Sequence, residues 1–115
     1  MHELVARAQD IARRAHAGQT DKAGLPYIQH VARVAAAVAD DPQAESVAWL
    51  HDVLEDCSDW VRAHEAEFTA FPGHILDAVQ LLTRSTETPD AAYYAGIRDN
   101  RLALRVKLAD IADNG

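Results

Sequence analysis

The chain alternates between stretches with a helical period of apolar residues and short polar breaks. In residues 3–16, apolar side chains recur at spacings of three and four, which indicates an amphipathic helix with its charges mostly on the other faces. The same period predicts helices in the remaining segments, which are residues 28–39, 44–56, 59–68 (with Ser58 as its N-cap), 75–83, 90–98 and 101–114. These are seven helical segments, one of them short (90–98), so the pattern predicts an all-α bundle of about six helices.

The predicted helix 44–56 combines a buried pattern with ionisable residues. It is apolar around much of its circumference, which is typical of a helix inside the core. Its second half reads WLHDVLED, in which His51 and Glu55 are four residues apart and share a face. Asp52 and Asp56 are spaced in the same way. A histidine and three carboxylates are therefore embedded in a predicted core helix.

Ionised carboxylates in such a helix would cost several kcal/mol each without a counter-charge. No Lys or Arg lies three or four residues from any of the three, so a bound cation is the simplest way to offset that cost. Imidazole with carboxylate oxygens suits Mn²⁺, Fe²⁺ or Zn²⁺ better than Ca²⁺. In the alternative interpretation, Asp56 belongs to a loop, Glu55 faces water and His51 is a hydrogen-bonded core histidine.

Composition narrows the class of protein. A length of 115 residues fits one domain, and an apolar fraction of 49% with only nine Gly and Pro residues favours helices. The formal charge of −7 repels nucleic-acid backbones, so binding to a nucleic-acid polymer is not expected. A phosphorylated ligand would need local positive charge, which a divalent cation supplies.

The single cysteine, Cys57, excludes an intramolecular disulfide and agrees with a reducing cytoplasm. No run of about 18 apolar residues is present, so no membrane span is expected. The alanines of the second predicted helix offer a surface for a dimer. The last helix either ends at Gly115 as a C′ glycine or belongs to a chain that is a shortened version of something longer.

Three motifs carry a resemblance to a known family. The runs AGQTDKAGLPYIQH (17–30), WLHDVLED (49–56) and RVKLADIADN (105–114) occur in the order and spacing of the HD-domain hydrolases. The chain is similar in particular to the small alarmone hydrolases and to the hydrolase domain of the Rel/SpoT proteins. Over residues 1–115, the resemblance implies a single HD domain, an all-helical bundle with metal ligands on several helices.

The resemblance also implies a ligand set and an activity. Its ligands for one ion, typically Mn²⁺ in this family, fall on four residues: His30, His51, Asp52 and Asp110. Three predicted helices can bring these residues together in the core of a bundle, where such sites are commonly built. The implied activity is (p)ppGpp 3′-pyrophosphohydrolysis, in which water activated by the ion attacks a nucleotide phosphate.

Further roles follow from the same resemblance. Glu55 and Asp56 are expected to position or deprotonate the attacking water, as carboxylates one turn from the ligands can. Lys22 and Tyr27 are expected beside the phosphates or base of the substrate, and Asn114 in contact with the nucleotide.

Asp21 departs from the family, which usually has a basic residue there that packs against the purine. A carboxylate cannot make that stacking contact and repels phosphates. The natural substrate is therefore open between the alarmone and another nucleotide, such as a nucleoside monophosphate or NADPH. A third hypothesis is a catalytically silent HD module that binds a nucleotide or a protein. His16 is expected either to line the pocket or to pack in the core.

Overall fold

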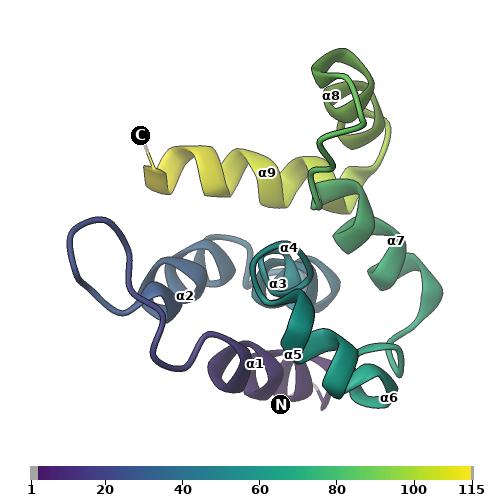
Figure 1. The fold of residues 1–115 in the computed structure, drawn as a ribbon. Coiled ribbons are helices and arrows are strands. Elements are labelled where there is room, and N and C mark those ends of the chain that lie inside the picture. The colour runs from purple at the N-terminus through teal and green to yellow at the C-terminus, as the bar shows by residue number, and fades with distance from the viewer. Residues whose placement is uncertain (1–2, 115) are drawn as a thin grey trace.

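The structure is a computed structural model that describes residues 3–114 (Figure 1). Within that range the chain forms nine helices: α1 (Glu3–Ala15), α2 (Tyr27–Ala37), α3 (Pro42–Leu50), α4 (Val53–Asp56), α5 (Ser58–Ala63), α6 (Glu65–Phe68), α7 (Gly73–Leu82), α8 (Asp90–Arg98) and α9 (Arg101–Asn114). Six of them have nine or more residues, and α4 to α6 are short. The only β-pairing in this range is an isolated bridge between Thr20 and Pro26. The predicted all-α fold is confirmed.

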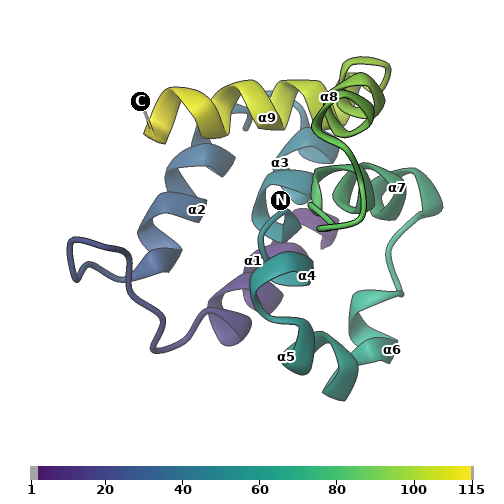
Figure 2. The ribbon, with the colours of Figure 1, turned by 45° about the horizontal axis from the view of Figure 1, so that its top comes forward.

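Helix α3 lies at the centre of the bundle. It contacts α1, α2, α7 and α9, and Figures 1 and 2 show α9 running across α2 and α3 on the side opposite α1. Almost every residue from Ala44 to Leu50 is buried, as the apolar pattern around this helix predicted. The buried hydroxyl of Ser46 donates to the carbonyl of Pro42 at 2.8 Å, so burial leaves it hydrogen-bonded.

The start of α3 is fixed by its own sequence. Asp41 is the N-cap, and its carboxylate accepts the backbone N–H of Gln43 at 2.9 Å and of Ala44 at 3.5 Å. Pro42 occupies the first helical position, where a missing N–H costs nothing. The DDPQ break therefore acts as a helix start signal.

The predicted continuous helix 44–56 is wrong. α3 ends at Leu50, His51 and Asp52 form a turn, and α4 begins at Val53. The Nδ1–H of His51 donates to the carbonyl of Ala48 at 2.5 Å, the group that the N–H of Asp52 would use in an uninterrupted helix. The histidine side chain thus competes with the backbone at the point where the helix breaks.

The predicted helix 59–68 is also divided. α5 ends before His64, which has φ −125° and ψ 35°, and α6 starts after it. The Nδ1–H of His64 donates to the carbonyl of Trp60 at 2.9 Å, and the two rings stack at 4.1 Å. Ser58 is the first residue of α5 and makes no capping hydrogen bond there, so its predicted role as the N-cap is wrong.

No helix in residues 3–114 combines the length and the apolar character needed to cross a membrane. The alanines of the second helix, expected to offer a surface for a dimer, differ in their exposure. Ala35 is fully buried within the chain, whereas its neighbours Ala36 and Ala37 are exposed.

Replacing Asp41 by alanine is expected to lower the free energy of unfolding by about 1 kcal/mol, because two N–H groups of α3 lose their acceptor. Asp41→Asn is the control: it keeps a capping oxygen and loses only the exposed ion pair with Arg101, at 3.1 Å. Urea denaturation of both variants measures the difference. Equal loss in the two variants would show that the ion pair, and not the cap, stabilises this end of α3.

Candidate metal centre

Three separate segments bring four ligand-type side chains together. His30 comes from α2, His51 and Asp52 from the turn between α3 and α4, and Asp110 from α9. One ligand atom from each lies within 4.8 Å of all the others. The imidazoles are buried, and the side chains of Asp52 and Asp110 are only 13% and 16% exposed. The structure thus brings together all four residues that the sequence analysis nominated as ligands.

His51 presents a nitrogen to this cluster. Because its Nδ1–H is bonded to Ala48, the neutral ring has its lone pair on Nε2. Nε2 is shielded from solvent and lies 3.1 Å from Asp52 Oδ2 and 3.6 Å from Asp110 Oδ1, and in the neutral ring no donor reaches it. A lone pair and two carboxylates therefore face one another, which requires a proton or a metal ion between them.

His30 approaches Asp110 from the other side. Its Nε2 lies 2.8 Å from Asp110 Oδ1, and its Nδ1 lies 2.5 Å from Asp113 Oδ2. The hydrogen bond to Asp110 is the main cause that raises the pKa of His30, and the one to Asp113 adds to it. With both nitrogens bonded to carboxylates, the metal-free ring carries a positive charge.

The pKa values of His51 and Asp110 also indicate protonated imidazoles beside ionised carboxylates. Burial disfavours a charged His51 ring, but hydrogen bonds to Asp110 and Asp52 outweigh it and raise the pKa of His51 to about 10. Burial would raise the pKa of Asp110, yet its hydrogen bonds to His30 and His51 lower it well below the usual range. Protons on the imidazoles thus offset the carboxylates in the metal-free protein. Two imidazoles with two carboxylates are a donor set that suits a divalent transition metal.

Tyr27 is hydrogen-bonded to one of the candidate ligands, Asp52. Its hydroxyl donates to Asp52 Oδ2 at 2.5 Å, and burial together with this bond raises the pKa of the phenol. The family resemblance implied a position for Tyr27 beside the phosphates or base of the substrate. In the structure its hydroxyl orients Asp52, the kind of outer contact that fixes a metal ligand.

Glu55 and Asp56, the predicted catalytic pair, lie on α4 and are exposed. Glu55 Oε1 accepts the backbone N–H of Arg84 at 3.0 Å. Partial burial and the nearby Asp52 raise the pKa of both carboxyls. The alternative interpretation was right that Glu55 faces water, whereas Asp56 belongs to α4 and not to a loop.

The loop before α2 holds the predicted substrate residue Lys22, which is exposed. Asp21 beside it turns its carboxylate into the loop, where Oδ1 accepts the backbone N–H of Ala23 at 2.9 Å and of Leu25 at 3.0 Å. This residue therefore stabilises the loop conformation, as aspartate commonly does in turns. Asn114 ends α9, but its side chain lies outside the described residues, so its predicted contact is not placed.

His16 is buried in a small polar group behind Tyr27. Its Nδ1 lies 2.8 Å from Gln19 Oε1 and 3.5 Å from the sulfur of Cys57, and its ring centroid lies 5.1 Å from that of Tyr27. Burial, followed by the charges of Asp56 and Asp52, raises the pKa of the Cys57 thiol, which disfavours a nucleophilic thiolate.

Asp113 is the site residue that the sequence analysis missed. It lies three residues after Asp110 on α9, so the two carboxylates share a helix face. That spacing was the signal that could have found it.

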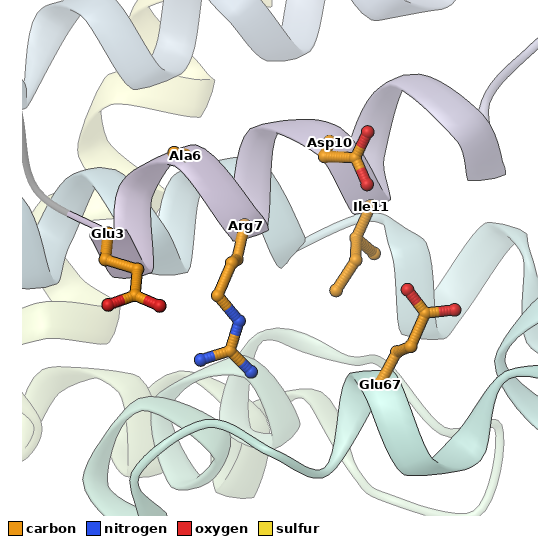
Figure 3. Close-up of a pocket in the computed structure, with 6 residues that line it drawn as sticks. All are labelled: Glu3, Ala6, Arg7, Asp10, Ile11 and Glu67. Atoms are coloured by element: carbon orange, nitrogen blue, oxygen red, sulfur yellow. The ribbon is translucent and has the colours of Figure 1, made fainter.

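A surface pocket on the outer face of α1 is separate from this centre. Glu3, Arg7 and Asp10 of α1 line it, and Glu67 of α6 faces them across the opening (Figure 3). It shares no residue with the cluster of histidines and aspartates.

No family model matches the chain, but curated proteins do. It is 33% identical to the guanosine-3′,5′-bis(diphosphate) 3′-pyrophosphohydrolase of Vibrio cholerae over 97% of this chain and 17% of that protein. The protein of the same name from Haemophilus influenzae is 36% identical over 90% of this chain and 17% of its own length. The bifunctional (p)ppGpp synthase/hydrolase SpoT of Escherichia coli K12 is 32% identical over 90% of the chain and 16% of its own.

The chain thus spans less than a fifth of the length of the curated relatives that it matches. Over nearly its whole length, however, it is similar to proteins with hydrolase names, so the predicted resemblance to Rel/SpoT proteins is confirmed.

Metal binding is expected to release about two protons per ion at neutral pH, because His30 and His51 must lose a proton before they can ligate. With both pKa values raised, affinity rises with pH through the neutral range, by roughly 100-fold per pH unit while both rings are charged. Calorimetric titration with Mn²⁺ in two buffers of different ionisation enthalpy measures the protons released. Identical heats in the two buffers would contradict the protonation described above.

Proposed function

We propose that this chain is a metal-dependent phosphohydrolase of the (p)ppGpp 3′-pyrophosphohydrolase type, with Mn²⁺ as its ion. The observation that carries the proposal is the convergence of four ligand atoms from three distant segments within 4.8 Å. The similarity to pyrophosphohydrolases over more than 90% of the chain supports the choice of substrate class. The proposed location is the cytoplasm, where a nucleotide alarmone would be met.

His30, His51, Asp52 and Asp110 would hold the ion. Two of these ligands are oriented by neighbours, since Ala48 fixes the tautomer of His51 and Tyr27 fixes Asp52. A divalent ion supplies Lewis acidity, which lowers the pKa of water and polarises a phosphoryl oxygen.

Glu55 and Asp56 are the proposed proton acceptors. Their raised pKa values make both carboxylates more basic than free ones, which suits a general base at neutral pH. Glu55 is held toward the loop after α7 by its bond to the N–H of Arg84. Both residues are exposed, three and four residues after Asp52, so a proton taken from water can pass to solvent.

Substrate phosphates must overcome a net charge of −7. Lys22 on the loop before α2 is one proposed phosphate contact. Tyr27, beside Asp52, is proposed to lie by the phosphates or the base of the substrate, and Asn114, at the end of α9, to contact the nucleotide. Asp21 leaves the loop without the arginine that would stack on guanine, and its carboxylate is occupied by backbone N–H groups. That observation favours a second candidate, the same chemistry on a different nucleotide.

With Mn²⁺, the protein is expected to release pyrophosphate from ppGpp in a panel that also holds nucleoside monophosphates and NADPH. Phosphate or pyrophosphate from another member, and none from ppGpp, would support the second candidate instead. Light scattering on the same protein measures its oligomeric state and so tests the dimer proposed from the alanines of the second helix.

Glu55→Gln is expected to lower kcat about 100- to 10,000-fold with the ion still bound, because the amide cannot take a proton. Glu65→Gln, an equally exposed change on α6, is the matched control and should leave the rate unchanged. Wild-type activity in Glu55→Gln would remove Glu55 from the mechanism and leave Asp56 as the acceptor.

Asp52→Ala is expected to abolish both ion binding and turnover, since it removes one of the four proposed ligands. Metal content after dialysis and the rate on the best substrate are the two measurements. A wild-type protein that binds Mn²⁺ but hydrolyses no member of the panel would be the silent nucleotide-binding module.

A further inference from the structure

Two pairs of side chains face each other across the α2–α9 contact. On α2, His30 and Arg33 are three residues apart and share a helix face. On α9, Asp110 and Asp113 have the same spacing. The first pair member on each helix is a candidate ligand, and the second lies about one turn further along its own helix.

Asp113 joins these residues into one network. Its Oδ1 accepts the Nε–H of Arg33 at 2.7 Å, and its Oδ2 accepts from Arg33 Nη2 at 3.1 Å. The same Oδ2 lies 2.5 Å from Nδ1 of His30. A two-point bond from a guanidinium fixes both the position and the plane of a carboxylate.

The exposure of these groups separates the network from an ordinary surface ion pair. The side chain of Asp113 is 17% exposed and that of His30 is 8% exposed, whereas Arg33 is 54% exposed. An exposed pair between long side chains contributes little to stability. Here the carboxylate is turned inward, against a buried ring that faces the cluster of ligands with its other nitrogen.

We propose that Asp113 is a positioning residue of the metal centre. Held by Arg33, it accepts the Nδ1–H of His30 and so keeps the lone pair of Nε2 directed at the ion position beside Asp110. A carboxylate behind a ligating histidine fixes the tautomer and raises the basicity of the nitrogen that binds the metal. Asp113 itself is no ligand of that ion, because Nδ1 and Nε2 lie on opposite sides of the ring. The inference rests on the proposed metal-dependent function.

The test compares Mn²⁺ affinity by calorimetry in Asp113→Ala, Asp113→Asn and the wild type. Asp113→Ala is expected to weaken binding about 10- to 100-fold, the usual effect of losing such an outer partner. Asp113→Asn keeps an oxygen that can accept the N–H and loses only its charge, so its loss is smaller, about threefold to tenfold. This partial rescue by asparagine separates the loss of the positioning hydrogen bond from the loss of side-chain volume.

The matched control is Asp40→Ala. Asp40 follows α2 and pairs with Arg105 of α9, so its removal also deletes an ion pair between the same two regions without touching a histidine. Its Mn²⁺ affinity should stay within about twofold of the wild type, as expected for an exposed pair.

A second measurement follows the ring of His30 directly. In protein loaded with Zn²⁺, a d¹⁰ ion compatible with NMR, the hydrogen-bonded Nδ1–H should give a slowly exchanging signal in the wild type, Asp113→Asn and Asp40→Ala. The signal should be lost in Asp113→Ala. Should that variant fail to fold by circular dichroism, Asp113→Asn against Asp40→Ala carries the comparison.

Wild-type affinity and an unchanged Nδ1–H signal in Asp113→Ala would overturn the inference and leave the proposed function intact. A wild-type protein that binds neither Mn²⁺ nor Zn²⁺ would instead remove the metal centre, and the inference with it.

Discussion

Two carboxylates and two imidazole nitrogens meet where α2, α9 and the turn after α3 converge, and their mutual repulsion has to be offset by positive charge. In the metal-free protein a proton on each imidazole supplies that charge, because the carboxylates of Asp110 and Asp52 raise the pKa of His51 despite its burial. A divalent cation can replace both protons. His30 of α2 is hydrogen-bonded to Asp110 and Asp113 of α9, so the polar group of the centre also joins these two helices.

The break at His51 links the fold to the centre. By bonding to the carbonyl of Ala48, the ring ends α3 and fixes which nitrogen faces Asp110. One hydrogen bond thus determines both where the helix stops and which tautomer the ligand adopts. His64 divides α5 from α6 through the same kind of bond to Trp60, but its ring stacks on that tryptophan and is not part of the candidate metal centre.

The residues around the four candidate ligands mainly orient side chains of the centre through hydrogen bonds and add little charge. Tyr27 bonds to Asp52, Asp113 to His30, and the backbone of Arg84 to Glu55. Asp21, whose charge would repel a phosphate, is tied into its own loop. Under the proposed function, the overall charge of −7 would leave phosphate binding to the ion and to a few local cations, so metal loading would be a condition for substrate binding as well as for catalysis.

The sequence by itself determined the helical class, the burial of α3 and the residue types of the centre. The helical period of apolar residues shows which side of a segment faces the core. The close spacing of His51, Asp52 and Glu55 shows that these polar residues lie together in one buried segment. The sequence could not determine where the predicted helices broke, because a histidine competes with its own backbone only when packing holds the ring in place. Only the tertiary structure assigned Asp113 to His30 and Tyr27 to Asp52. Those bonds join residues 83 and 25 positions apart, and periodicity carries no information about partners at that distance.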